Sequence, residues 1–248
     1  MSKCLIVTGG GRGIGAEVSR KAAKQGYSVC VNFHRDQTSA QKLVRELEKE
    51  GANALAYQAD VSQEEEVEAL FQTVEKDLGT PEALVNNAGI LDLQTRVDGM
   101  NAERIQRIFA VNVTGSFLCA REAVKRMSTK YGGKGGSIVN LSSGAAKYGS
   151  PGEYVDYAAS KAAIDTLTIG LAKEVAEEGI RVNAVRPGFI DTEIHQSGGE
   201  PDRMERVRPL VPMKRVGQAE EVADAIMWLL SDKASYTTGM ILDVSGGR

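Results

Sequence analysis

The chain opens with Cys4-Leu5-Ile6-Val7 and continues as Thr8-Gly9-Gly10-Gly11-Arg12-Gly13-Ile14-Gly15, and this stretch decides the fold. Four consecutive apolar residues predict a short strand buried on both faces, as in a parallel sheet. The helical pattern of residues 14–25 follows the glycine turn and stops at Gly26. A strand, a glycine turn and a helix in this order are typical of the first unit of a doubly wound α/β sheet.

The rest of the chain alternates between strand and helix patterns. We predict further strands at 28–33, 54–58, 83–86, 137–141, 181–185 and 240–244, and helices at 39–50, 62–78, 102–127, 154–178 and 219–230. This alternation indicates βαβ units, a Rossmann-like parallel sheet and a single three-layer domain over residues 1–248. Because ligands bind such sheets beyond the carboxyl ends of the strands, we expect the site in the loops that follow strands.

Local patterns add detail to this alternation of strands and helices. Ser62 and Glu65 have the spacing of a capping box at the start of a helix. The helix 102–127 is expected to kink near residues 112–115, and residues 90–101 and 132–136 are expected to form loops. Residues 189–210 include His195 and Pro201 and form a long irregular stretch, which is the expected substrate lid.

Composition excludes several classes of protein. The chain has 30 basic and 33 acidic residues, a net charge of −3, which gives no argument for a nucleic-acid partner or an anionic membrane. Cys4, Cys30 and Cys119 lie in apolar runs and are expected to be buried, reduced thiols. We find no signal peptide or membrane span and expect a cytoplasmic protein. The two histidines, His34 and His195, lack the spacing of a metal pair, so no metal is predicted.

The glycine turn favours a phosphate-containing ligand. The cofactor-binding residues expected there are Gly9, Gly11, Arg12, Gly13, Ile14 and Gly15. Without side chains the backbone can approach a phosphate closely, and the start of the following helix offers free N–H groups and a positive dipole end. A tight structural turn is the alternative, but the position between the first strand and the first helix favours dinucleotide binding.

Tyr157 and Lys161 are four residues apart in a predicted helix, so their side chains share one face. A cation beside a phenol lowers its pKa from about 10, and the phenol can then exchange a proton with an alcohol or carbonyl. Reaching a pKa of about 7 requires about 4 kcal/mol, whereas one cation in water supplies about 1 kcal/mol. The site must therefore be partly desolvated, or a second positive charge must help. For this motif alone, a solvated Tyr–Lys pair is the alternative.

Further motifs follow the predicted strands in order. They are Asp60-Val61, Asn86-Asn87-Ala88-Gly89, Asn112, Leu141-Ser142-Ser143, the Tyr157 and Lys161 pair, and Pro187-Gly188. With the T-G-x-x-x-G-x-G turn, they make the whole chain resemble a short-chain dehydrogenase/reductase of the single-domain type. The likeness is greatest to bacterial sugar dehydrogenases and 3-oxoacyl carrier-protein reductases. The resemblance implies a homotetramer that transfers a hydride between a nicotinamide cofactor and a small-molecule carbonyl or alcohol.

The resemblance also implies roles for individual residues. Tyr157 is the acid/base, Lys161 supports it and binds the nicotinamide ribose, and Ser143 binds the substrate oxygen, with Ser142 as the alternative. Asn112 holds a water on a proton path, or else only bends its helix. The cofactor contacts implied are Asp60, Val61, Asn87, Ala88, Gly89, Pro187, Gly188, Ile190 and Thr192. Asn86 is expected to tie loops together, and Tyr148 and Tyr154 to pack or line the pocket.

The choice of cofactor depends on the residues after the second strand. Asn32 occupies the strand end, and His34 and Arg35 follow; all three are expected to contact the cofactor, and no carboxylate stands where a ribose 2′-hydroxyl would be bound. The guanidinium of Arg35, with that of Arg12, suits a 2′-phosphate, and NADP(H) is favoured. Asp36 lies close to the strand end, where a small shift would bring its carboxylate to the ribose, so NAD(H) is the alternative cofactor.

Two alternatives concern function and partners. A non-catalytic NAD(P)-binding regulator would keep the fold without turnover, but the set Asn112, Ser143, Tyr157 and Lys161 favours an enzyme. Lys125, Arg126 and Lys130 could dock an acidic carrier protein, although a solvated helix end explains the cluster better.

Overall fold

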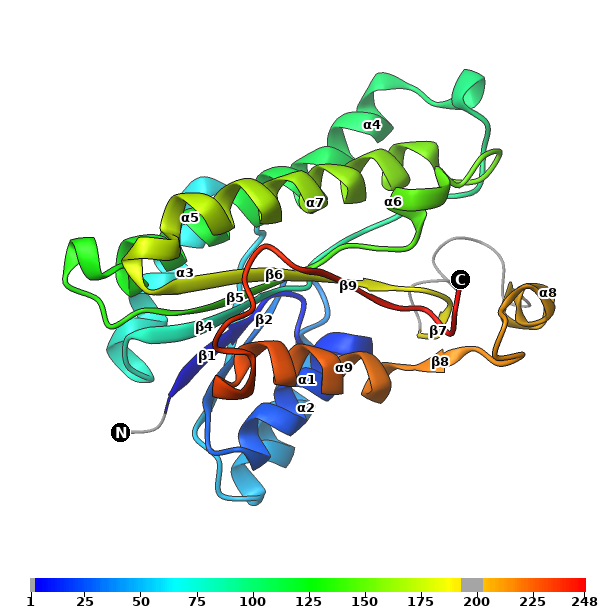
Figure 1. Ribbon diagram of the computed structural model, residues 1–248. Helices are drawn as coiled ribbons and strands as arrows, with labels where there is room; N and C mark the ends of the chain where they lie inside the picture. The colour runs from blue at the N-terminus through cyan, green and yellow to red at the C-terminus, as the bar shows by residue number, and fades with distance from the viewer. Residues whose placement is uncertain (1–2, 193–202) are drawn as a thin grey trace.

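The computed structural model describes residues 3–192 and 203–248 and centres on a seven-stranded parallel sheet (Figure 1). The strands follow the order β3-β2-β1-β4-β5-β6-β9. Their bounds are β1 Cys4–Val7, β2 Ser28–Phe33, β3 Ala54–Gln58, β4 Pro81–Asn86, β5 Gly136–Leu141, β6 Ile180–Pro187 and β9 Ile241–Val244. The predicted Rossmann-like parallel sheet is confirmed. Its order reverses between β1 and β4, which is where such sheets bind ligands.

Helices cover both faces of the sheet (Figure 1). One layer consists of α1 Gly13–Lys24, α2 Gln37–Lys49 and α9 Ala219–Leu230. The other consists of α3 Glu64–Asp77, α4 Ala102–Phe109, α5 Gly115–Met127 and α7 Val155–Val175. Among the described helices, none is long and apolar enough to cross a membrane.

The apolar strands supply two cores, one on each face of the sheet. In β1, Leu5 and Val7 pack in the core beneath α1 and α9, whereas Cys4 and Ile6 pack in the core beneath α3 and α5. All four are at most 1% exposed, which explains why β1 is apolar at every position. The three cysteines are free and buried, as expected, and burial raises the pKa of Cys4 and Cys119 to about 12.

Buried amides tie neighbouring strands together. Asn86 at the end of β4 donates through Nδ2 to Oδ1 of Asn140 on β5 (2.9 Å) and to the carbonyl of Ser116 on α5 (3.2 Å). Asn140 in turn donates to Thr168 on α7 (2.9 Å). All four residues are at most 7% exposed. The expected structural role of Asn86 is therefore confirmed.

The predicted kink in the helix 102–127 is confirmed as a π-helix, η2, over Ala110–Thr114, between α4 and α5. The predicted capping box at Ser62 is wrong. The helix begins at Glu64 with Gln63 at its N-cap, and Ser62 donates from its N–H (3.0 Å) and its hydroxyl (2.8 Å) to Oδ1 of Asp60. Asp60 thus organises this turn, because its carboxylate is the stronger acceptor.

Several short elements were not predicted. They are η1 Val97–Gly99, η3 Thr129–Tyr131, α6 Ala145–Tyr148, η4 Ala176–Glu178, β7 Ile190–Asp191, α8 Arg203–Val207, η6 Arg208–Leu210, β8 Gly217–Gln218 and η7 Asp232–Ala234. Of these, η1, β7, α8 and η6 lie in segments that were expected to be irregular, and η4 replaces the last turn of the predicted helix 154–178. The expected substrate segment 189–210 is thus partly regular. Its residues 193–202, with His195 and Pro201, lie outside the described residues.

Candidate active site

The predicted motifs meet at one cavity beyond the carboxyl ends of the strands. Its walls come from the glycine turn, the loops after β4, β5 and β6, and α7. The lining residues include Ile14, Asn87, Gly89, Ser142, Ser143, Tyr157, Lys161, Pro187, Gly188, Ile190 and Thr192. These segments are spread over some 180 positions of sequence, so only the crossover topology of the sheet brings them together.

The glycine turn is held in shape by the loop after β4. Asn87 donates through Nδ2 to the carbonyls of Thr8 and Gly9 (2.9 Å each), and the Thr8 hydroxyl accepts from the N–H groups of Asn87 and Ala88 (3.0 Å each). A Cβ at Gly15 would stand 2.6 Å from Nδ2 of Asn87, so only glycine allows this approach. Since α1 begins here without an acidic residue in its first turn, the turn fits the phosphates of a dinucleotide.

The adenosine end of the expected site lies between the glycine turn and the N-terminus of α2. A Cβ at Gly11 would stand 3.2–3.3 Å from backbone and side-chain atoms of Ala40, so the turn and α2 are in close contact here. Arg12 and Arg35 are both exposed at this edge. Asp36 caps α2 by accepting from the N–H of Ser39 (3.0 Å). Its pKa is lowered by hydrogen bonds from Ser39 and by the charge of Arg12.

Asn32 is buried, whereas Asp60 is partly exposed. Asn32 is 1% exposed; its Nδ2 donates to the carbonyl of Ala59 (3.1 Å) and its Oδ1 accepts from the N–H of Gly9 (3.3 Å). This asparagine therefore supports the turn from behind, and its amide does not face the expected ribose. Asp60 remains partly exposed, and its Oδ2 lies 3.7 Å from Nε2 of His34.

Lys161 is buried beneath the candidate acid/base. It is 4% exposed, its Nζ donates to the carbonyl of Leu141 (2.6 Å), and it lies 5.7 Å from the centroid of the Tyr157 ring. Burial lowers the pKa of Lys161 to about 8, while the charge of Asp165 acts in the opposite direction. The desolvated surroundings required for a strong effect on a phenol are therefore present at this helix face.

The two serines after β5 differ in burial and in hydrogen bonding. Ser142 is 3% exposed and its hydroxyl donates to the carbonyl of Lys161 (3.2 Å). Ser143 is half-buried and its Oγ accepts from the N–H of Ala145 (3.1 Å), which leaves the hydroxyl proton for a ligand. This difference favours Ser143 as the residue that binds a substrate oxygen.

Asn112 lies in the π-helix and is fully buried. Its Oδ1 accepts from the N–H of Ile90 (2.8 Å), and its Nδ2 donates to the carbonyl of Ile90 (2.9 Å) and to the hydroxyl of Ser160 (3.0 Å). A Cβ added to Gly89 would stand 3.5 Å from Asn112 Oδ1 and 3.4 Å from Lys161 Nζ. The asparagine thus borders the lysine, and its side chain fixes the loop after β4.

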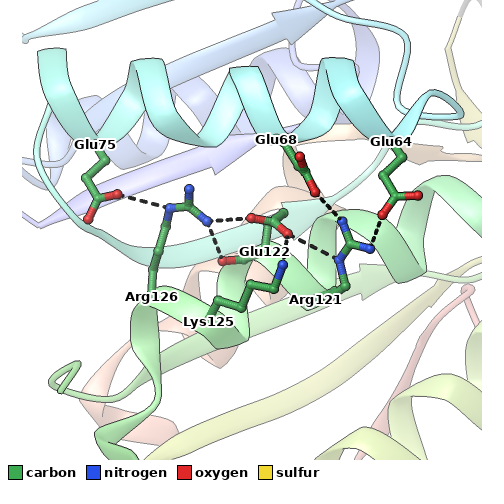
Figure 2. Close-up of polar contacts among 7 residues, drawn as sticks. All are labelled: Glu64, Glu68, Glu75, Arg121, Glu122, Lys125 and Arg126. Carbon is green, nitrogen blue, oxygen red and sulfur yellow. Dashed lines mark hydrogen bonds and ion pairs between the residues drawn. The ribbon is translucent and has the colours of Figure 1, made fainter. Parts of the chain in front are cut away.

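Two residues of the basic cluster at the end of α5, Lys125 and Arg126, form ion pairs within the protein (Figure 2). Arg126 contacts Glu75 of α3 (3.2 Å) and Glu122 (2.7 Å), and Lys125 contacts Glu122 (2.8 Å). Arg121 extends the same network to Glu64 and Glu68 of α3. Arg126 therefore joins two helices, whereas Lys125 pairs within α5; the solvated helix end expected for the cluster is wrong for Arg126, which is 13% exposed.

Sequence reasoning missed one ion pair at the site. Asp165 lies one turn after Lys161 on α7 and accepts through Oδ2 from Arg186 Nη2 (2.6 Å) and Nε (3.0 Å) at the end of β6. The available signal was a carboxylate four residues after a lysine, which marks Asp165 but not its arginine partner. Within residues 3–192 and 203–248, no group of three or more His, Cys, Asp and Glu side chains could hold a metal ion.

Comparison with known proteins agrees with this arrangement. Residues 9–248 match the family described as Enoyl-(Acyl carrier protein) reductase. The chain is 57% identical to the uncharacterized oxidoreductase YgfF of Escherichia coli, over 98% of both chains. It is 38% identical to glucose 1-dehydrogenase 2 of Bacillus subtilis, over 99% of this chain and 94% of the relative. It is 36% identical to the 3-oxoacyl-[acyl-carrier-protein] reductase FabG of Staphylococcus aureus, over 100% and 98%.

The chain belongs to the short-chain dehydrogenase/reductase family. It is an oxidoreductase that acts on CH–OH and C=O groups, and the non-catalytic alternative is not favoured.

Proposed function

We propose that the protein is an NADP(H)-dependent oxidoreductase that interconverts a small carbonyl compound and its alcohol, with Tyr157 as the acid/base. The observation that carries the proposal is that Tyr157, Lys161 and Ser143 line one cavity together with the glycine turn. The turn and the N-terminus of α1 would hold the pyrophosphate. Pro187, Gly188, Ile190 and Thr192 would hold the nicotinamide half, Asn87, Ala88 and Gly89 would line the adenosine ribose, and Asp60 and Val61 would flank the adenine.

Each residue of the centre has a separate part in the mechanism. The nicotinamide supplies or accepts the hydride when it is bound. In reduction, the Tyr157 phenol donates its proton to the substrate oxygen, and in oxidation the phenolate takes the proton back. The buried ammonium of Lys161 stabilises the phenolate, and the Ser143 hydroxyl donates to the substrate oxygen. The Asn112 side chain holds the loop after β4 beside the lysine.

Loss of the phenol tests the reaction. We expect NADPH oxidation, followed by absorbance, with at least one member of a panel of ketoacyl thioesters, sugars, quinones and ketosteroids. In Tyr157→Phe, kcat should fall by about 10²–10⁴-fold while cofactor affinity is kept, because only proton transfer is lost. Tyr131→Phe, at a tyrosine 61% exposed on η3, is the matched control. Tight cofactor binding without turnover on any compound would instead favour a regulator.

The preference for NADP(H) rests on Arg12 and Arg35. Both are exposed at the adenosine edge, whereas the Asp36 carboxylate caps α2. A planar guanidinium binds phosphate well, so the ratio of kcat/KM for NADPH to that for NADH should fall in Arg35→Ala. Lys42→Ala, at an exposed cation on α2, controls for net charge. An unchanged ratio in Arg35→Ala would favour NAD(H), with Asp36 reading the ribose.

Two substrate classes are favoured by the relatives, a 3-oxoacyl thioester and a sugar. The ion pairs of Lys125 and Arg126 with Glu75 and Glu122 weigh against docking of an acidic carrier protein on α5. They do not disfavour an acyl thioester on a smaller carrier. Rates on acyl thioesters and on sugars in the panel separate the two classes, and residues 189–210 are proposed to select between them.

We propose a cytoplasmic homotetramer assembled through the outer face of α4, α5 and α7. Ile105, Phe117 and Ile169 lie on these three helices and are 40–50% exposed. Exposed apolar side chains grouped on one layer are typical of an interface. Light scattering after gel filtration measures the assembly, and Phe117→Glu should shift it towards smaller species.

A further inference from the structure

Alternating charges connect Lys161 to the segment that follows Ser143. Asp165 is held by Arg186 at 2.6 and 3.0 Å, and Arg186 Nη1 lies 3.9 Å from Oδ1 of Asp243 on β9. Asp243 Oδ2 accepts from Lys147 on α6 (2.9 Å). The series therefore begins one helical turn from Lys161 and ends on α6, which starts two residues after Ser143. Both ends lie close in sequence to proposed catalytic residues.

The Asp165 end of the series is desolvated and incompletely paired. The Asp165 side chain is 10% exposed and that of Arg186 is 20% exposed. Both hydrogen bonds from Arg186 go to Oδ2, and Oδ1 is buried without a hydrogen-bond partner among residues 3–192 and 203–248. A carboxylate in such surroundings interacts with other charges more strongly than a solvated one.

Lys161 is the cation that this carboxylate can reach on its own helix. Residues four apart on a helix have Cβ atoms about 5–6 Å apart, so Asp165 and Lys161 share one face of α7. The other groups around the ammonium are the Tyr157 phenol, the Leu141 carbonyl and the Asn112 amide, and Arg186 approaches from β6 behind Asp165. Burial lowers the pKa of Lys161, and the charge of Asp165 opposes this effect.

We propose that Asp165, held in place by Arg186, is the counter-ion that keeps Lys161 protonated, and is a positioning residue for the proton-transfer site. The ammonium is needed to stabilise the Tyr157 phenolate, so this role rests on the proposed function. Burial without Asp165 would favour the neutral amine, which cannot stabilise a phenolate. Arg186 orients the carboxylate through its two hydrogen bonds to Oδ2.

A stability measurement tests this role without any substrate. The free energy of unfolding in urea is measured from pH 6 to pH 10 for the wild type and Lys161→Met, and the difference reports deprotonation of Lys161 in the folded state. In an Asp165→Asn background, the pH at which this difference begins to rise should fall by about one pH unit. An onset that does not move overturns the proposal.

Three further variants keep the test decisive. Glu174→Gln removes an exposed carboxylate from the same helix and should leave the onset in place; an equal movement would mean a general charge effect and overturn the proposal. Asp165→Glu should restore the wild-type onset. If Asp165→Asn does not fold because Arg186 is left unpaired, Asp165→Asn with Arg186→Gln removes both charges and should give the same lowered onset.

The activity readout separates this proposal from the function on which it rests. In Asp165→Asn, kcat/KM for carbonyl reduction should begin to fall with rising pH about one unit earlier than in the wild type. A lowered stability onset without turnover on any substrate would contradict the proposed function and leave the role of Asp165 standing. Turnover combined with an unchanged stability onset would support the proposed function and contradict the role of Asp165.

Discussion

Two groups of charges on the same layer of helices behave in opposite ways. At the α3–α5 contact, Glu122 is bound by Lys125, Arg126 and Arg121 (Figure 2). Burial acts to raise the pKa of Glu122, but the hydrogen bonds from Lys125 and Arg126 outweigh it and hold the pKa below its ordinary value. At the reaction centre, Asp165 is the carboxylate that acts on Lys161, but it is bound to Arg186, and burial outweighs its charge and lowers the pKa of Lys161.

The difference shows that one layer of helices contains both a charge network that stabilises the fold and a charged group suited to proton transfer. A buried charge that is fully hydrogen-bonded by opposite charges contributes to the free energy of unfolding. A buried charge that is only partly compensated costs free energy, and its pKa moves towards neutral pH, where proton transfer is useful. The same helical scaffold therefore holds one network for cohesion and one for reactivity.

The largest expected effect comes from Lys161. Its folded-state pKa is about 8, below its unfolded value of about 10.4, so the unfolded chain binds more protons between these two pH values. The stability of the wild type relative to Lys161→Met should therefore be flat below about pH 8 and rise by about 3 kcal/mol towards pH 10.4. Urea unfolding measures this difference. A fall over the same window would contradict a destabilising buried ammonium.

Glu122→Gln should show the opposite pH dependence and a smaller effect. Because the folded-state pKa of Glu122 is lowered, its contribution is present above the unfolded value of about 4.3 and is lost as pH falls through the folded value. At pH 7 the variant should be about 2 kcal/mol less stable, since Lys125 and Arg126 lose their shared partner. The two proteins should converge in acid. A difference that persists in acid would point to packing instead.

The smallest effect is expected for Lys125→Gln. The Lys125 side chain is 52% exposed and reaches Glu122 from three residues away on the same helix. Such pairs contribute about 0.5 kcal/mol or less, and salt screens them. The loss in unfolding free energy should disappear in high salt, whereas that of Glu122→Gln should largely remain. If the loss of unfolding free energy depended on salt equally in both variants, the exposed Lys125 and the buried Glu122 would not differ in how solvent screens them.

The sequence was sufficient for the elements whose signals are local. Apolar runs such as Cys4–Val7 predicted strands because both faces of a parallel sheet are buried, and the kink near Asn112 was predicted where the π-helix lies. Tyr157 and Lys161 were found because four residues make one helical turn. The cavity that they share with the glycine turn was expected from the rule on strand ends.

Contacts between distant segments were not predictable in the same way. Arg126 meets Glu75, 51 residues away, and Asp165 meets Arg186, 21 residues away, and no local pattern marks either pair. Asn32 was expected at the cofactor because it ends a strand, yet its amide satisfies buried carbonyls. Ser62 had the spacing of a cap, but Asp60 competed for its donors. For Arg126, Asp165 and Asn32 a partner distant in sequence decided between local possibilities, whereas for Ser62 the deciding partner lies two residues away.

The hydrogen bonds of Thr8, Asn87 and Asn112 have a consequence for protein engineering. They join the glycine turn to the loop after β4, and they join that loop to the π-helix and α7. The segments that carry the catalytic residues are therefore held together by hydrogen bonds among themselves. In the part of the chain that the structure describes, these hydrogen bonds include no residue of 203–210. Libraries that vary residues 203–210 can therefore explore new specificities while these hydrogen bonds around the catalytic residues are kept.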